Sequence, residues 1–201
     1  MFNDADITEL LRQYPPVDYA IAYGSGVLQQ SNYDYTVEDS KLPMIDIIFA
    51  VSDAKRWHMT NMAINPSHYS SDIPLSPSNI AYIQENIGAG LWYNTYIPIN
   101  IRAFPNRQIK YGVISTHCLM EDLTEWKYLY AAGRLHKPVL VMKTNESIED
   151  AVAINRLHAV NTSLCLLPQY FSEKELYMTI AALSYNGDPR MLIAENPKKV
   201  V

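Results

Sequence analysis

Two short stretches of the sequence carry residue types that could do chemistry. The first is the turn formed by Gly24, Ser25 and Gly26, which ends the apolar run "VDYAIA". Backbone N–H groups at glycines can approach a phosphate closely because no Cβ stands in the way, and Ser25 can donate a further hydrogen bond. The second is Asp46, a single acid inside the apolar run "MIDIIFAV". An ionised carboxylate in such a strand needs a cation or a metal as its partner.

Each motif also has a purely structural interpretation. The Gly-Ser-Gly turn is neither a Walker A loop nor a GxGxxG dinucleotide fingerprint, and a simple hairpin could use the same glycines. Mg²⁺, however, takes oxygen ligands and is often shared between a carboxylate and substrate phosphates. An Mg²⁺ held by Asp46 would therefore connect the two motifs, and the pair favours a nucleotide site.

The elements that must position these residues predict an α/β protein with a mixed sheet. Apolar runs bounded by turn residues indicate strands at 19–23, 44–51, 91–101, 108–115 and 137–143. Helical spacing of apolar residues indicates helices at 4–14, 54–65, 80–87 and 119–130, with Gly133 as the cap of the last one. From Ser147 onward the pattern is helical, so we expect one domain at 1–145 and a smaller helical domain at 146–201.

Composition limits the class of protein. The 201 residues are 48% hydrophobic and 18% charged, which argues against disorder. No run approaches the roughly 18 consecutive apolar residues of a membrane span, so any membrane contact is expected to be peripheral. Cys118 and Cys165 lie in apolar contexts without CxxC spacing, and we expect both to be buried free thiols in a reducing compartment.

Charge is unevenly distributed along the chain. Residues 1–100 hold 4 Lys and Arg against 11 Asp and Glu, whereas residues 101–201 hold 12 against 10. An acidic half suits a metal and the basic segment at 102–143 suits phosphate, although solvated surface would give the same distribution. The net charge of −5 argues against a nucleic-acid partner, which usually requires a basic stripe.

A strand that ends in Gly-Ser, followed by a strand that carries an acid, resembles the polymerase-β-like nucleotidyltransferase fold. A closer resemblance comes from eight segments that occur in the order seen in the mitochondrial translocator assembly and maintenance family, the CDP-diacylglycerol synthases of that organelle. The segments span about residues 14–201 and read "YGSG", "MIDIIFAV", "WHMTN", "NPSHYS", "QENIGAGLWYN", "IKYGVIS", "DLTEWKYLYAAGRLHKPV" and "LSYNGDPRM". Each is modest alone, but eight in order are specific.

This resemblance implies an activity and a location. It implies an Mg²⁺-dependent phosphatidate cytidylyltransferase, which transfers a cytidylyl group from CTP to phosphatidic acid and releases pyrophosphate. The product, CDP-diacylglycerol, would serve cardiolipin and phosphatidylglycerol synthesis. The resemblance also implies a peripheral protein on the matrix side of the mitochondrial inner membrane, with a winged-helix-like second domain. The alternative is a catalytically weak member of the fold that binds nucleotide or maintains protein translocation.

Carried over residue by residue, the resemblance implies a set of site residues. Asp46 and Lys110 would be catalytic, with Asp46 as the Mg²⁺ ligand. The triphosphate would contact Tyr23, Gly24, Ser25, Gly26 and Lys110, although Lys110 could also be a strand-edge lysine in solvent. His68 and Tyr69 belong to the family segment "NPSHYS" and would be substrate contacts, although a loop His-Tyr pair is also typical of surface. Apart from the resemblance, Arg134 and Lys137 lie at a helix end and a strand start, which suits either a substrate phosphate contact or a dipole-stabilising role. The superfamily strand usually bears two acids two residues apart, but here Met44 and Ile48 flank Asp46. A second ligand must therefore come from elsewhere, with Asp34, Glu38, Asp39 and Asp122 as the candidates.

The C-terminal sequence gives one further expectation. The chain ends at "NPKKVV" without a helix stop, and no segment combines an apolar face with a Lys/Arg-rich polar face. We therefore expect the C-terminal domain to continue beyond residue 201, with the membrane attachment supplied by that continuation.

Overall fold

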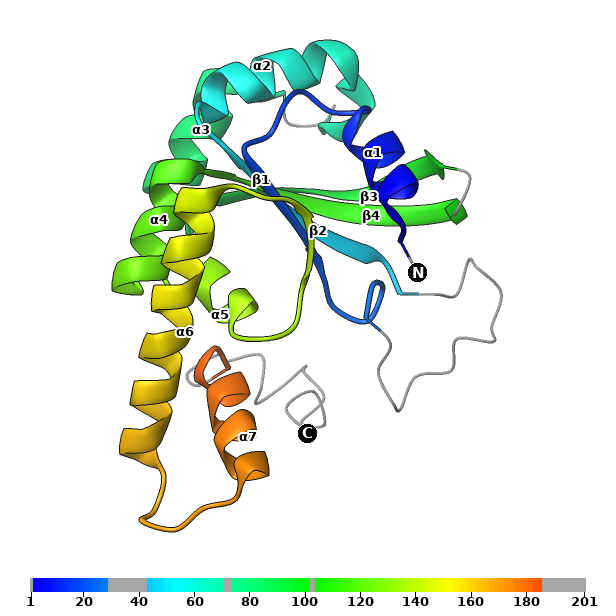
Figure 1. Ribbon diagram of the computed structural model, residues 1–201. Coiled ribbons are helices and arrows are strands. Elements are labelled where there is room, and N and C mark those ends of the chain that lie inside the picture. Colours follow the sequence, from blue (N-terminus) through cyan, green and yellow to red (C-terminus); the bar gives the residue numbers. More distant parts are fainter. Residues whose placement is uncertain (1, 29–42, 71–73, 102–103, 186–201) are drawn as a thin grey trace. The chain divides into compact units, whose positions relative to one another are not determined.

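The computed structural model describes residues 2–28, 43–70, 74–101 and 104–185, and these form two compact units (Figure 1). The first unit comprises residues 1–119 and 139–145, and the second comprises 120–138 and 146–201. Segment 120–138 thus groups with the C-terminal helices, although a functional domain boundary at 145 stays a prediction. The proposed ligands Asp34, Glu38 and Asp39 and the terminal "NPKKVV" lie outside the described residues.

The first unit is built on a five-stranded mixed sheet with the order β3-β4-β2-β1-β5. Neighbouring strands are antiparallel except for β2 and β4, which run parallel. The predicted α/β class with a mixed sheet is confirmed, and it is consistent with a nucleotidyltransferase-like fold. The strands are β1 (Tyr19–Tyr23), β2 (Ile45–Val51), β3 (Leu91–Ile101), β4 (Phe104–Ser115) and β5 (Leu140–Lys143).

Helices α1 (Asp4–Leu11), α2 (Ala54–Ile64) and α3 (Pro77–Asn86) pack on one face of this sheet (Figure 1). Successive residues of a strand point to opposite faces, so alternate residues of β2 and β4 enter the core beneath these helices. Trp57 of α2 and Ala81 of α3 meet the strand residues there. The residues between them, including Asp46 and Lys110, face the other side. Sheet alternation thus fixes which side chains can form a site together.

The predicted helix over residues 119–130 is wrong. In place of a single helix over 119–130, the chain forms α4 (Thr116–Glu125) and then α5 (Ala131–Leu135). Trp126 and Leu129 both have φ 54°, which ends the helix. Gly133 lies inside α5 rather than capping a helix, and a Cβ there would meet the Cβ of Ser184 at 2.3 Å. Glycine is therefore required at 133 by close packing.

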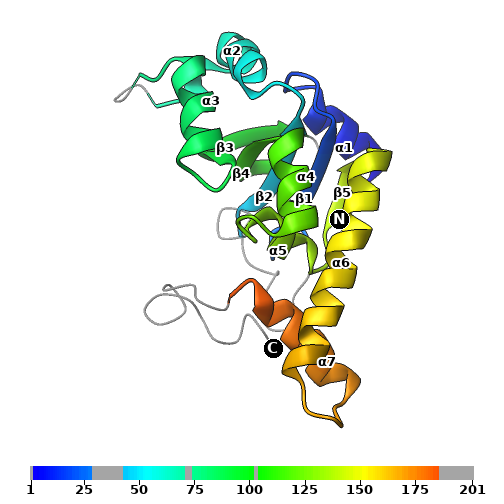
Figure 2. The same cartoon turned by 90° about the vertical axis from the view of Figure 1, so that its left-hand side faces the viewer.

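The C-terminal helices form an antiparallel pair, α6 (Glu146–Leu166) and α7 (Glu173–Leu183), as both views show (Figures 1 and 2). Ser172 caps α7 through a capping box with Glu175. Within the described ranges, no helix has the length and apolarity needed to cross a bilayer. Cys118 is buried as expected, but Cys165 is exposed on α6, so the prediction of two buried thiols is wrong for Cys165. The winged-helix-like character of this part stays a prediction.

Candidate active site

Asp46 and Lys110 form an ion pair on the sheet face opposite α1–α3. The two residues are register partners on the parallel strands β2 and β4, and Lys110 Nζ lies 2.9 Å from Asp46 Oδ1. Their side chains are 27% and 32% exposed, respectively, so solvent reaches both charges. Tyr23 of β1 is paired with Asp46 from the other side. The expectation that the carboxylate in β2 needs a partner is met by this lysine.

The Gly-Ser-Gly turn begins directly beside this pair. Gly24 has φ +78°, and a Cβ there would lie 3.4 Å from Asp46 Oδ2. Its carbonyl oxygen accepts hydrogen bonds from the N–H groups of Val27 and Leu28, so the strand ends in one helical turn. A Cβ at Gly26 would lie 2.4 Å from the carbonyl oxygen of Met44. The structure therefore brings the turn and the carboxylate together, and it gives Gly26 a packing role.

His68 and Tyr69 lie on the other face of the sheet. The centre of their surroundings is the Tyr111 hydroxyl, which accepts hydrogen bonds from Asn61 Nδ2 and Asn94 Nδ2, both at 2.8 Å. His68 Nδ1 is 3.0 Å from the same hydroxyl. The Tyr69 hydroxyl accepts from Asn61 Nδ2 at 3.0 Å. Tyr111 follows Lys110 in β4 and points to the opposite face, so this polar network does not share a surface with Asp46.

The number of hydrogen bonds that a tyrosine hydroxyl can donate and accept limits where the protons of this network lie. Because the Tyr111 hydroxyl accepts two amide N–H groups, its own proton is free to be donated, and an unprotonated His68 Nδ1 at 3.0 Å can accept it. Burial lowers the pKa of His68 and also that of His58, which agrees with neutral imidazoles. His58 Nε2 faces Gln84 Oε1 at 3.0 Å and His58 Nδ1 faces the Tyr69 hydroxyl at 2.9 Å. Burial raises the pKa of both Tyr69 and Tyr111, so their hydroxyls stay protonated.

Asp122, a candidate second metal ligand, is buried and accepts hydrogen bonds from the backbone. Its Oδ1 accepts the N–H groups of Tyr128 and Leu129, each at 2.7 Å, and its Oδ2 accepts that of Ala132 at 2.9 Å. Only 1% of Asp122 is exposed. These contacts turn the chain between α4 and α5 and explain why the predicted helix is broken. The placement does not support Asp122 as a metal ligand.

Arg134 and Lys137 belong to the second unit, where both lie against tyrosine rings. The Arg134 guanidinium lies 5.4 Å from the centre of the Tyr130 ring. Lys137 Nζ donates to Ser184 Oγ at 2.9 Å and lies 4.1 Å from the Tyr185 ring centre. Burial, with a smaller contribution from the Arg134 charge, lowers the pKa of Lys137 to about 8. Their role as substrate contacts stays a prediction.

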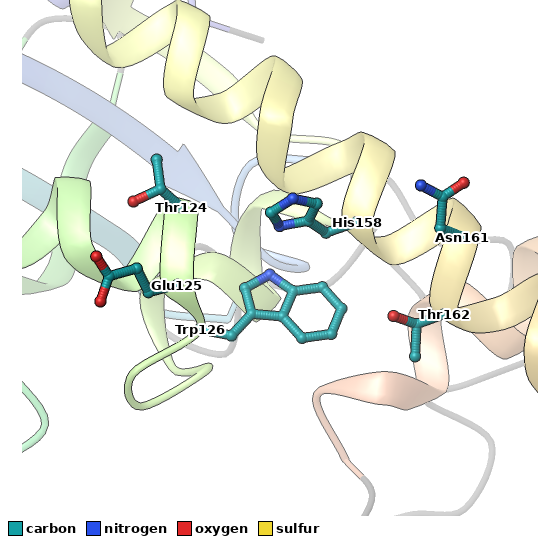
Figure 3. Close-up of a pocket in the computed structure, with 6 residues that line it drawn as sticks. All are labelled: Thr124, Glu125, Trp126, His158, Asn161 and Thr162. Carbon is teal, nitrogen blue, oxygen red and sulfur yellow. The ribbon is translucent and has the colours of Figure 1, made fainter.

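The second unit also contains an open hollow of about 350 Å³ (Figure 3). The Trp126 indole forms part of its lining, and Trp126 Nε1 donates to Asn155 Oδ1 at 2.7 Å. Trp126 and His158 meet edge to face with their ring centres 6.2 Å apart. None of the residues predicted from the sequence to form the site lines this hollow.

Comparison with known proteins decides the family. The family model described as "Phosphatidate cytidylyltransferase, mitochondrial" matches residues 7–201. The chain belongs to this family. The resemblance seen in the sequence segments is thereby confirmed.

Relatives that carry the same family name, mitochondrial phosphatidate cytidylyltransferase, come from distant organisms. The zebrafish (Danio rerio) relative is 45% identical over 191 residues, and the Xenopus laevis relative is 43% identical over 187. The alignments cover 92% of this chain and 54% and 53% of those proteins. The Schizosaccharomyces pombe relative is 41% identical over 186 residues, with 92% and 45% covered. The chain thus spans about half the length of the curated relatives it matches.

The sequence did not predict two residues beside the Asp46–Lys110 pair and two residues on the opposite sheet face. Tyr93 of β3 and Gly112 of β4 lie beside Lys110, and Asn94 and Tyr111 organise the opposite face. One signal was available, because a glycine inside a strand often marks a close approach of another group. In the structure, a Cβ at Gly112 would meet Tyr93 Cε1 at 2.7 Å.

Proposed function

We propose that the protein transfers a cytidylyl group from CTP to phosphatidic acid, giving CDP-diacylglycerol and pyrophosphate for cardiolipin and phosphatidylglycerol synthesis. Membership of the family supports this reaction. The observation that carries it is the Asp46–Lys110 pair, half-exposed on adjacent strands beside the turn at Gly24. A carboxylate, an ammonium group and a glycine turn in one place provide the groups that a nucleoside triphosphate requires.

Asp46 fits the role of an Mg²⁺ ligand. Mg²⁺ is commonly held by one or two carboxylates together with substrate phosphates. A single aspartate beside a triphosphate site therefore fits this type of metal coordination. Among the described residues, no group of three or more His, Cys, Asp and Glu side chains could hold a metal. When bound, Mg²⁺ would neutralise triphosphate charge and polarise the α-phosphate. Asp34, Glu38 and Asp39 remain candidates for a second ligand.

Lys110 would change partner when the triphosphate binds. In the structure its ammonium group neutralises Asp46. If the carboxylate binds the metal, Lys110 is released to donate hydrogen bonds to phosphate oxygens from nearly the same place. Gly24, Ser25 and Gly26 would hold the phosphates at the end of β1, with Tyr23 alongside.

The reaction needs alignment more than acid–base catalysis. An ionised oxygen of phosphatidate attacks the α-phosphorus of CTP, and the new P–O bond replaces the bond to the β-phosphate, which leaves as pyrophosphate. A phosphate monoester has its second pKa near 6, so the attacking oxygen requires no strong base at pH 7. We assign His68 no such role, because it lies in the polar network on the other sheet face.

We further propose CTP, phosphatidic acid and an anionic membrane surface as partners, with peripheral attachment to the matrix side of the mitochondrial inner membrane and no nucleic-acid partner. Arg134 and Lys137 remain proposed substrate contacts. His68 and Tyr69 are better suited to positioning β4 than to touching substrate, because their side chains form hydrogen bonds with other side chains of the network.

A second function is favoured by one observation, the single acid on β2 where the superfamily usually has two. A catalytically weak protein that binds nucleotide, or maintains protein translocation, would bind CTP without turnover. The test is to incubate the protein with CTP, Mg²⁺ and phosphatidic acid in vesicles, and to measure CDP-diacylglycerol and pyrophosphate. Equal amounts of both products, absent when EDTA is added, are expected. CTP binding without either product would support the second function and contradict the first.

A further inference from the structure

Two tyrosines meet above the middle of the sheet, next to the Asp46–Lys110 pair. Tyr23 lies on β1 and Tyr93 on β3, and β2 and β4 separate these strands in the sheet. The two hydroxyl oxygens are nevertheless 3.2 Å apart. Adjacent strands are about 4.8 Å apart, so each ring must extend across a neighbouring strand for the hydroxyls to meet. We call this pair the tyrosine bridge.

Gly112 makes the bridge possible. It is the register partner of Tyr93 on β4, and a Cβ at this position would lie 2.7 Å from Tyr93 Cε1. Any other residue would push the ring off the strand. Gly112 is two positions from Lys110 and therefore on the same face. The ring that Gly112 admits lies 5.0 Å, measured to its centre, from Lys110 Nζ.

Among the residues that the structure describes, Lys110 thus contacts two partners of different kinds. Asp46 Oδ1 holds its ammonium group by charge at 2.9 Å, and the Tyr93 ring attracts the same group through its π face. A metal or a phosphate that binds Asp46 or Lys110 would replace the first contact. It would leave the second in place, because the ring is fixed by Gly112 below and by Tyr23 at its hydroxyl.

We propose that Tyr93 is a positioning residue of the nucleotide site, which keeps the Lys110 ammonium group in place when Asp46 no longer holds it. This inference rests on the proposed function, since it assumes that Lys110 contacts phosphate. We expect loss of the Tyr93 ring to weaken triphosphate binding more than loss of its hydroxyl does. The ring acts on Lys110 directly, whereas the hydroxyl acts only by restraining Tyr23 and the ring.

The test is a double-mutant cycle read by binding of the triphosphate group. Affinities for CTP with Mg²⁺ and for tripolyphosphate are measured by calorimetry for the wild type, Tyr93→Leu, Lys110→Ala and the double variant. Tyr93→Phe and Tyr23→Phe, which remove only the hydroxyl contact, cover the case in which Tyr93→Leu fails to fold. Tyr82→Leu is the matched control, because Tyr82 is 62% exposed on α3. Urea unfolding shows whether each variant is folded.

Tyr93→Leu is expected to weaken binding of both probes by about 2- to 30-fold, the range of a cation–π contact. The loss is expected to vanish in the Lys110→Ala background, and Tyr93→Phe is expected to bind within about 2-fold of the wild type. A purely structural tyrosine would lower stability without coupling to Lys110. An equal loss in both backgrounds, or no loss with Tyr93→Leu, would overturn the proposal.

Cytidylyl transfer is measured separately on the same samples, so that the two hypotheses fail differently. A protein that binds tripolyphosphate with the expected coupling, but makes no CDP-diacylglycerol, contradicts only the proposed function. A protein that makes the product without coupling between Tyr93 and Lys110 contradicts only the positioning role. Absence of any triphosphate binding contradicts both.

Discussion

The two faces of the sheet treat polar side chains in opposite ways, and neighbouring residues of β4 show the contrast. Tyr111 points toward α2, is fully buried, and has its hydroxyl surrounded by Asn61, Asn94 and His68. Lys110 points to the other face, where it and Asp46 keep 32% and 27% of their side-chain surface exposed. Tyr111, Asn61 and Asn94 are buried and bonded to one another, with His68 half-buried at their edge, whereas the ion pair is open to solvent. We call the region around Tyr111 the closed face and the region around Asp46 and Lys110 the open face.

This difference suits the two sets of residues to different roles, the first to positioning strands and the second to binding a ligand. A buried polar network is stabilising only when its members are satisfied by one another, and then it fixes the side chains and the strands that carry them. Such a network has little capacity left for a ligand. A half-exposed ion pair contributes about 0–1 kcal/mol to stability, so a metal or phosphate can replace it at low cost. The network around Tyr111 therefore fixes β3 against β4, and the exposed pair of Asp46 and Lys110 is where the proposed chemistry would take place.

The largest expected effect comes from the open face. Asp46→Ala should reduce cytidylyl transfer by about 10³-fold or more, because the proposed metal loses its ligand. The free energy of unfolding should change by no more than about 1 kcal/mol, since the ion pair is half-exposed. Product formation and urea unfolding measure the two quantities, with Glu85→Ala on the exposed surface of α3 as the control. Turnover near that of the wild type would show that Asp46 is not the ligand.

A substitution on the closed face should lower stability and leave CTP binding nearly unchanged. Tyr111→Phe removes a hydroxyl that satisfies two amide N–H groups and His68, so the free energy of unfolding should fall by about 2–4 kcal/mol. CTP affinity of the folded protein should stay within a few-fold of the wild type. Tyr82→Phe, at an exposed position, is the matched control. If CTP binding were lost while stability was unchanged, the contrast between the two faces would be wrong.

A smaller effect is expected from the turn at the end of β1. Ser25→Ala should weaken CTP binding by about 10-fold, the lower end of what one hydrogen bond to a charged group contributes. Unfolding should be unaffected beyond about 0.5 kcal/mol. Ser67→Ala is the control, because Ser67 is exposed in the 3₁₀ helix η2 (Pro66–His68). A loss of stability in place of affinity would assign the turn to the fold alone.

The smallest effect is a pH dependence to which the buried histidines of the closed face contribute. Burial holds the folded-state pKa values of His58 and His68 below 6.5, so the unfolded chain binds protons first as the pH falls. The contribution of these two histidines to stability is therefore complete above pH 6.5 and is lost as the pH falls toward their folded-state pKa values. His68→Gln should lose less stability between pH 7.5 and 5.5 than the wild type. The same loss in His68→Gln and in the exposed-site control His117→Gln would exclude His68 as a source.

The chemistry-bearing residues of the open face could be predicted because their signals are local. A glycine turn after an apolar run, an acid within a strand and a lysine at the start of "KYGVIS" can each be read from adjacent residues. The helix break at Trp126 could not be predicted in this way. It depends on Asp122, whose carboxylate accepts N–H groups six, seven and ten residues along the chain. Apolar spacing alone indicated one continuous helix across that turn.

The sequence by itself determined the strands, the turn and the identity of Asp46 and Lys110, because alternation and turn chemistry act over a few residues. Only the tertiary structure decided which residues meet. The parallel pairing of β2 with β4 places Lys110 beside Asp46. On the opposite face, tertiary packing brings His68 and Tyr69 into the network around Tyr111. The hydroxyls of Tyr23 and Tyr93 meet although the residues lie 70 positions apart. Such contacts follow from strand order and register, which depend on burial of the whole sheet face rather than on any local pattern.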